Sequence, residues 1–127
     1  LPGPGKRPLS SMTPTIVLKD GKVALVTGSP GGSRIISTVL QVIVNALDHR
    51  LDIASAVAAP RLHHQWLPDE VRVEQGFAQD VLDALRAKGH RITTPMGQTS
   101  ANSIAITPRG IEGGPDPRTR GAEAAGY

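Results

Sequence analysis

Two short apolar runs joined by Asp20 and Gly21 restrict the fold of this chain more than any other feature of its 127 residues. Asp-Gly between two runs rich in β-branched residues favours a type I′ turn, in which both central residues have positive φ. We therefore predict an antiparallel hairpin with strands over residues 15–18 and 23–27. Because nearly every position in both strands is apolar, we expect the sheet to be covered on both faces. This pattern indicates a layered fold with helices outside a sheet.

Beyond the hairpin, helix patterns alternate with short strand patterns. The helical segments carry apolar residues at i, i+3, i+4 and i+7 spacing, and the strand segments are short and partly β-branched. Predicted helices span residues 35–47, 52–59 and 77–88, and predicted strands span residues 71–74, 91–94, 103–107 and 111–113. The first helix is apolar on more than one side, so we expect it to be central. Ser33 and Asp52 are expected N-caps, and Gly89 is expected to end the third helix.

The remaining segments define the expected boundaries of the domain. Residues 1–8 hold three prolines and two glycines, which predicts a linker or loop, and residues 9–127 are expected to form a single α+β domain. Residues 61–69 are expected to be irregular. The third helix is expected to turn its apolar residues inward: Phe77, Val81, Leu82 and Leu85. The last stretch, residues 115–127, is rich in Gly and Ala, so its Asp and Arg residues would have to hold it in place.

Composition narrows the classes of function. The chain has no cysteine, which excludes a disulfide framework and a thiolate metal site. The net charge of +3 and the pI of about 9.8 suggest nucleic-acid binding, but Lys and Arg are spread along the chain without interleaved aromatic residues. We therefore expect no nucleic-acid partner. No run approaches the roughly 18 apolar residues of a membrane-spanning helix, so no span is expected.

The segment at residues 28–33 is the first candidate site. Gly31 and Gly32 lie between a predicted strand and a predicted helix, where consecutive backbone N–H groups and the helix dipole favour an anion or a developing oxyanion. The spacing fits neither a Walker loop nor a dinucleotide fingerprint. On composition alone, a plain tight turn packed under the helix is the favoured interpretation.

Three other polar groups carry weaker signals. The adjacent hydroxyls of Ser10 and Ser11 suit a substrate carboxylate, although serines in loops usually bond to the local backbone. His63 and His64 point in opposite directions on an extended segment, so we expect packing or hydrogen bonding of one ring rather than a metal site. Residues 116–118 hold an Asp and an Arg, which we expect to form ion pairs that hold the tail; a catalytic role is the weaker alternative.

Five motifs occur in the order found in one known family. They are RPLSSMTPTIV at residues 7–17, TGSPGGSRI at 27–35, APRLHHQWLP at 59–68, DPR at 116–118 and AAGY at 124–127. Together they resemble the gamma-glutamyltranspeptidase (glutathione hydrolase) family over almost the whole chain. The resemblance corresponds to the C-terminal part of that family's small subunit.

The resemblance implies a fold and a reaction. The fold is that of the N-terminal nucleophile hydrolases, a four-layer αββα sandwich of which this chain would form part. In the family, a zymogen cleaves itself into a large and a small subunit, and the new N-terminal Thr attacks the gamma-glutamyl amide of glutathione. The α-amino group of that Thr acts as the base. Water, an amino acid or a peptide then resolves the acyl-enzyme, and no cofactor or metal is implied.

The resemblance also implies roles for four residues. Ser10 and Ser11 match serines that hold the α-carboxylate of the gamma-glutamyl group, and Gly31 and Gly32 match the backbone donors of the oxyanion hole. The implied partners are glutathione or other gamma-glutamyl compounds, the large subunit and the upstream part of the small subunit. The implied location is periplasmic or extracellular, in a bacterium.

The nucleophile itself is expected outside these 127 residues. Thr13 and Thr15 follow the serines and do not match the family's catalytic Thr, so we expect the chain alone to be inactive. Two alternatives remain open. One is a related cephalosporin (glutaryl) acylase, and the other is a non-catalytic domain that has kept the fold.

Overall fold

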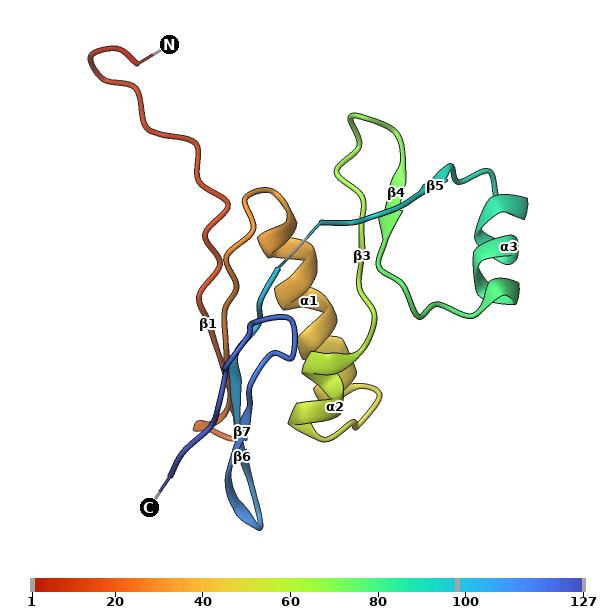
Figure 1. Ribbon diagram of the computed structural model, residues 1–127. Coiled ribbons are helices and arrows are strands. Elements are labelled where there is room, and N and C mark those ends of the chain that lie inside the picture. The colour runs from red at the N-terminus through yellow and green to blue at the C-terminus, as the bar shows by residue number, and fades with distance from the viewer. Residues whose placement is uncertain (1, 98, 127) are drawn as a thin grey trace.

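The computed structural model describes residues 2–97 and 99–126 (Figure 1). Leu1 is the first residue of the predicted linker and Tyr127 is the last residue of the AAGY motif, and both lie outside the described residues. The segment from Pro2 to Pro14 contains no helix or strand. The division into a linker over residues 1–8 and one domain over 9–127 stays a prediction.

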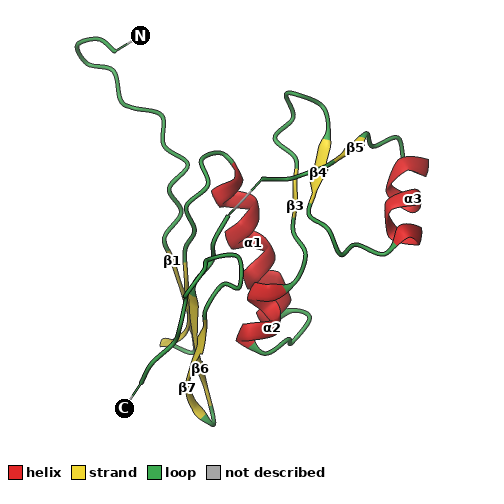
Figure 2. Cartoon of the chain, in the orientation of Figure 1, coloured by secondary structure: helices red, strands yellow, loops and turns green. Residues whose placement is uncertain are grey.

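A four-stranded antiparallel sheet is the main element of the fold. Its order is β1-β2-β6-β7, with bounds Thr15–Lys19, Lys22–Thr27, Ser103–Thr107 and Gly110–Gly114. The predicted hairpin is confirmed, because Asp20 and Gly21 have φ values of 51° and 75°, as a type I′ turn requires. The last two strands form a second hairpin, which Figure 2 shows beside the first.

Helices α1 (Arg34–Leu47) and α2 (Ile53–Ala58) pack against one face of this sheet. The core between these layers is aliphatic and consists of Leu25, Val42, Ile53, Val57 and Ala101. Gly114 makes the close approach of β7 to α2 possible, because a Cβ at that position would lie 2.9 Å from the Ile53 carbonyl oxygen. The Asp52 cap is confirmed, since its carboxylate accepts a hydrogen bond of 2.9 Å from Ser55 N–H.

The expectation that both faces of the sheet are covered is wrong for the described part of the chain. Strand pairing places alternate apolar residues on the face away from α1 and α2, and Ile16 and Ile111 are 64% and 77% exposed. The outer side of α1 is also open, so this helix is not central. The exposed apolar residues of the sheet and of α1 include Ile16, Leu18, Val23, Ile36, Leu40, Ile104, Ile106 and Ile111.

A smaller sheet lies beside the main one. It has the order β3-β4-β5, with bounds Leu62–His63, Val71–Val73 and Ile92–Thr93, so the expectation that residues 61–69 are irregular is wrong at β3. Helix α3 (Gln79–Ala87) precedes β5 and has no buried residue. Val81 is 44% exposed, so the prediction that it points inward is wrong: α3 lies at the edge of the molecule and little packs against that side (Figure 1).

Candidate active site

The antiparallel register brings four separate segments to one end of the main sheet. Thr15 pairs with Thr27, Thr27 pairs with Ser103, and Ser103 pairs with Gly114. The segments before β1 and β6, and those after β2 and β7, therefore leave the sheet at the same end. These segments carry the Ser-Ser motif, the Gly-Gly turn and the DPR motif.

The Gly-Gly turn has positive φ angles, which residues with a side chain rarely adopt. Gly31 and Gly32 have φ values of 136° and 59°. A Cβ at Gly31 would lie 2.8 Å from Thr99 Cγ2, so this position has no room for a side chain. The carbonyl oxygens of Gly31 and Gly32 accept hydrogen bonds from the N–H groups of Arg34 (3.2 Å) and Ile35 (3.1 Å), so the turn leads directly into α1.

The N–H groups of this turn suit an anion. Neither Gly31 N–H nor Gly32 N–H donates a hydrogen bond to another described residue. They precede the N-terminus of α1, where the helix dipole adds partial positive charge. The arrangement has the chemical properties of an oxyanion or carboxylate site.

The Ser-Ser motif lies on the extended segment before β1. Ser10 is exposed, and its Oγ accepts a hydrogen bond of 3.2 Å from Met12 N–H. Ser11 is partly buried, and its carbonyl oxygen accepts a hydrogen bond of 2.8 Å from the Thr13 hydroxyl. Further along, Pro14 Cα lies 3.8 Å from the place of a Cβ on Gly28, so this segment and the Gly-Gly loop are neighbours where they leave the sheet.

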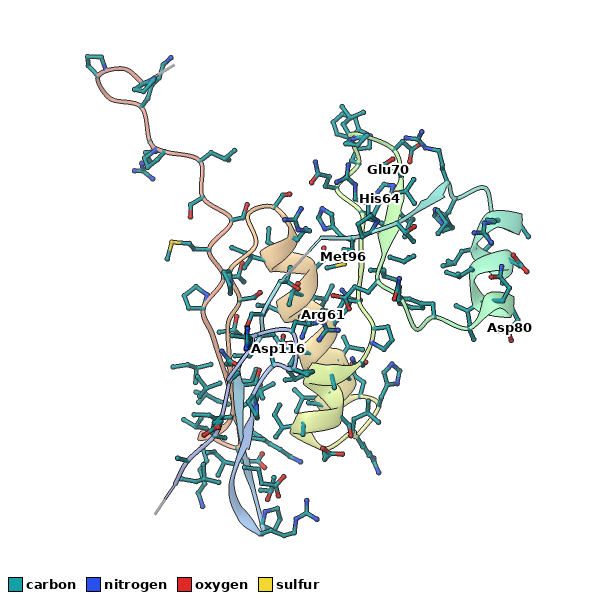
Figure 3. The ribbon with its side chains drawn as sticks, viewed as in Figure 1. Arg61, His64, Glu70, Asp80, Met96 and Asp116 are labelled. Carbon is teal, nitrogen blue, oxygen red and sulfur yellow. The ribbon has the colours of Figure 1, made fainter. Side chains whose placement is uncertain are left out.

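A buried ion pair holds the segment that follows β7 at this end of the sheet. The side chains of Arg61 and Asp116 are 1% and 0% exposed, and Arg61 Nη2 lies 2.7 Å from Asp116 Oδ2 (Figure 3). The same oxygen accepts a hydrogen bond of 2.6 Å from Ala101 N–H. Arg61 also donates to Val57 O at 2.6 Å and to Thr99 Oγ1 at 2.9 Å. Thr99 is the residue that leaves no room for a side chain at Gly31, so Arg61 is linked to the Gly-Gly turn through Thr99.

Arg118 extends this network along the C-terminal segment. Its guanidinium donates to both carboxylate oxygens of Glu74, at 2.8 Å and 2.5 Å, and to Asp116 Oδ1 at 3.2 Å. It also donates to the carbonyl oxygens of Val57 (3.0 Å) and Ala59 (2.9 Å) at the end of α2. The expectation that Asp and Arg residues hold the tail is therefore confirmed.

The network shifts the pKa values of its members. Burial opposes the charged form of Asp116, but hydrogen bonds from Ala101 N–H, Arg118 N–H and the Arg61 guanidinium outweigh it, so the pKa of Asp116 is lowered. Burial lowers the pKa of Arg61, and its bond to Asp116 opposes that change. For Arg118, burial also acts downward, yet the bonds to Glu74 and Asp116 outweigh it and raise the pKa.

The two histidines have different surroundings, and both rings make hydrogen-bonding contacts. His63 on β3 is 4% exposed and contacts the Ser37 hydroxyl with Nδ1 at 2.8 Å and Gln65 Oε1 with Nε2 at 2.9 Å. His64 is exposed and lies 3.1 Å from Asp69 Oδ1. Within residues 2–97 and 99–126, no group of three or more His, Asp or Glu side chains is arranged to hold a metal.

The arrangement of these motifs agrees with a comparison to known protein families. The sequence profile described as Gamma-glutamyltranspeptidase matches residues 1–126. The chain belongs to the gamma-glutamyltranspeptidase family. The resemblance inferred from the motifs is thereby confirmed.

Individual relatives support the same family assignment. The chain is 58% identical over 126 residues to the glutathione hydrolase proenzyme of Escherichia coli K12, covering 98% of this chain and 22% of that protein. A crystal structure of a Helicobacter pylori gamma-glutamyltranspeptidase variant is 52% identical with a TM-score of 0.85, covering 92% of this chain and 66% of that one. The α+β fold of the N-terminal nucleophile hydrolases is thereby confirmed for this chain.

An acylase is also among the relatives of this chain. The chain is 40% identical over 109 residues to the Acylase ACY 1 proenzyme of Pseudomonas sp. SE83, and the match covers 84% of this chain and 19% of that protein. The chain spans about a fifth of the length of the curated relatives it matches. Among the described residues, no helix has the length and apolar character needed to cross a membrane.

Sequence reasoning missed two charged residues of this sheet end. Arg61 and Glu74 are single charged residues in short segments, and no periodic pattern distinguishes them from surface charges. The one available signal was Arg61 within an otherwise apolar and neutral stretch, residues 53–63, where a charge requires a partner.

Proposed function

We propose that the complete protein cleaves gamma-glutamyl amides such as glutathione and transfers the gamma-glutamyl group to water, amino acids or peptides. The Gly31–Gly32 turn carries this proposal, because it presents at the start of α1 two N–H groups that donate to no described residue, on a loop that adjoins the Ser-Ser segment at Gly28. The 58% identity to a glutathione hydrolase proenzyme supports the choice of substrate.

In this reaction the nucleophile comes from another part of the protein, and this chain stabilises the charge that develops. A Thr hydroxyl from another part of the protein attacks the amide carbonyl carbon, while the Thr α-amino group takes the hydroxyl proton. The negative charge that develops on the carbonyl oxygen is stabilised by the N–H groups of Gly31 and Gly32. The C–N bond breaks, the leaving amine takes up the proton, and water or an amine then attacks the resulting ester.

Substrate orientation falls to the serine motif. In this proposal, the hydroxyls of Ser10 and Ser11 donate hydrogen bonds to the α-carboxylate of the gamma-glutamyl group. Charge-assisted bonds of this kind are shorter and stronger than neutral ones. The large subunit and the upstream part of the small subunit complete the site, and the protein acts in the periplasm or outside the cell.

The carboxylate role has a direct test in the complete enzyme. We expect replacement of Ser10 and Ser11 by Ala to lower kcat/KM for a gamma-glutamyl anilide by about tenfold to hundredfold. The same variant should cleave a 4-aminobutyryl anilide, which lacks the α-carboxylate, as fast as the wild type does. Met12→Ala, which changes an exposed neighbour, is the matched control. An equal loss on both anilides would show that the serines do not bind the carboxylate.

A glutaryl acylase is the second candidate function, and the 40% identity to an acylase proenzyme favours it. Glutaryl and gamma-glutamyl groups both carry the terminal carboxylate and differ in the α-amino group. Comparing kcat/KM for a gamma-glutamyl anilide and a glutaryl anilide therefore separates the two. Preference for the glutaryl compound would overturn the first proposal, and a complete protein that cleaves neither would be a non-catalytic domain with the same fold.

A further inference from the structure

The hydroxyl of Ser33 is not used as its position predicts. Ser33 is the N-cap residue of α1, but its side chain makes no cap hydrogen bond and its backbone is helical, with φ −59° and ψ −22°. The hydroxyl donates instead to Gln65 Oε1 at 2.7 Å. Because Ser33 directly follows Gly32, this bond ties the end of the Gly-Gly turn to the segment after β3.

The hydrogen bonds of Gln65 fix the orientation of its side-chain amide. Its Nε2 donates to Leu67 O at 2.9 Å, and its Oε1 accepts from Ser33 Oγ and from His63 Nε2. The opposite orientation would place the amide oxygen against the Leu67 carbonyl oxygen, and two acceptors repel each other. The amide oxygen is therefore the atom that faces both Ser33 and His63.

This orientation also fixes the tautomer of His63. An amide oxygen only accepts, so the hydrogen of the neutral ring lies on Nε2, and Nδ1 accepts from the Ser37 hydroxyl at 2.8 Å. His63 is buried between α1 and the segment that carries Gln65. The result is a chain of hydrogen bonds, which we name the turn clamp: Ser37, His63, Gln65 and Ser33.

We propose that His63 is a positioning residue that acts through Gln65 and Ser33 to hold the Gly31–Gly32 turn in the shape needed to bind the oxyanion. This inference rests on the proposed function. A misplacement of about 1 Å of a catalytic group lowers rates by about a hundredfold, so a tether one residue from the donors has a direct route to kcat. The clamp contacts the turn and not the substrate, so it affects kcat more than KM.

The neighbouring Gln41 offers a matched control. It also links α1 to β3, because its Nε2 donates to Ser37 O and Leu62 O and its Oε1 accepts from Leu62 N–H. It makes no bond to the turn or to Gln65. Replacing Gln41 by Met therefore weakens the same helix–strand contact and leaves the clamp in place.

The test uses the complete enzyme and a gamma-glutamyl anilide. We expect Ser33→Ala and Gln65→Leu each to lower kcat about tenfold with KM changed less than about twofold. The double variant should be no slower than the slower single variant, because the two residues act in series. Gln41→Met should keep kcat within about twofold of wild type even if its melting temperature falls.

His63 is tested by a conservative pair. The side-chain nitrogen of Gln can take the place of Nε2, whereas that of Asn takes the place of Nδ1. We expect His63→Gln to keep kcat near the wild-type value and His63→Asn to lower it as much as Gln65→Leu does. If the buried position does not tolerate either change, Ser33→Ala and Gln65→Leu decide the question, because both residues are exposed.

Two further measurements separate this inference from the proposed function. Gly31→Ala alters the turn without removing a clamp residue, since a Cβ there meets Thr99 and Arg34. If Gly31→Ala lowers kcat but Ser33→Ala and Gln65→Leu do not, the clamp is wrong and the oxyanion role stands. Hydrogen exchange of residues 28–35 tests the clamp without activity: faster exchange in Ser33→Ala and Gln65→Leu supports it, and unchanged exchange overturns it.

Discussion

At the scale of single residues, Asp116 joins more of the fold than its place near the C-terminus suggests. One oxygen bonds Arg61 and Ala101 N–H, and the other bonds the backbone and side chain of Arg118. Removing one partner of a buried ion pair leaves an uncompensated charge, which costs far more than a surface pair contributes. Asp116 therefore determines whether Arg61 is tolerated in the core.

We expect Asp116→Asn in the complete protein to lower the free energy of unfolding by about 3–5 kcal/mol at pH 7. Asp69→Asn, at an exposed carboxylate, is the control and should change it by less than about 0.5 kcal/mol. Denaturant unfolding followed by circular dichroism measures both. A loss for Asp116→Asn no larger than that of the control would mean that the ion pair is not required.

The same pair has a defined pH dependence. The folded pKa of Asp116 is lowered, so its contribution is fully present above the unfolded value, about 3.9, and is lost as the pH falls through the folded pKa. The difference in stability between wild type and Asp116→Asn should therefore be constant from about pH 5 to 8 and shrink below about pH 4.

Single residues also show what the sequence can and cannot predict. Asp20 and Gly21 define their turn locally, so the hairpin follows from two letters. Arg61 finds its partner Asp116 across 55 positions, and no local pattern encodes that pairing. The sequence predicts that the hydroxyl of Ser33 caps α1, but the fold brings Gln65 near, and the hydroxyl donates to the Gln65 side-chain oxygen instead.

At the scale of elements, α1 and α3 represent two extremes of packing. Helix α1 buries Ile35, Val39 and Val42, whereas α3 buries no residue. The spacing of apolar residues located both helices well. It did not predict how deeply each is buried, because that depends on what lies opposite the apolar side.

We expect the amides of α3 to exchange hydrogen faster than those of α1 in native protein, because few apolar contacts oppose local opening of α3. Hydrogen-exchange mass spectrometry of peptides over residues 79–88 and 35–47 measures the difference. Equal protection of the two helices would mean that a further part of the protein packs on α3.

At the scale of the whole molecule, the uncovered face of the main sheet is the largest departure from the prediction. Large contiguous apolar surface on a soluble protein usually marks an interface. The expectation that both faces are covered is wrong for the described residues, in which α1 and α2 cover one face and leave the other open.

We expect the 127-residue chain, expressed alone, to bind a hydrophobic dye and to associate as its concentration rises. Replacing Ile104 and Ile111 by Lys should reduce both effects, since these residues lie on the open face. Val81→Lys on α3 is the control and should change neither. Analytical ultracentrifugation measures the association, and a monomeric wild-type chain would contradict the prediction.

The register that gathers the motifs at one sheet end leaves the other end to two tight turns. Asp20 and Gly21 connect β1 to β2 there, and Pro108 and Arg109 connect β6 to β7. The whole length of the strands therefore separates both turns from the Gly-Gly turn. They are consequently suitable points for attaching a fluorophore or an affinity tag, from which an experimenter can follow the protein without disturbing the Gly-Gly turn.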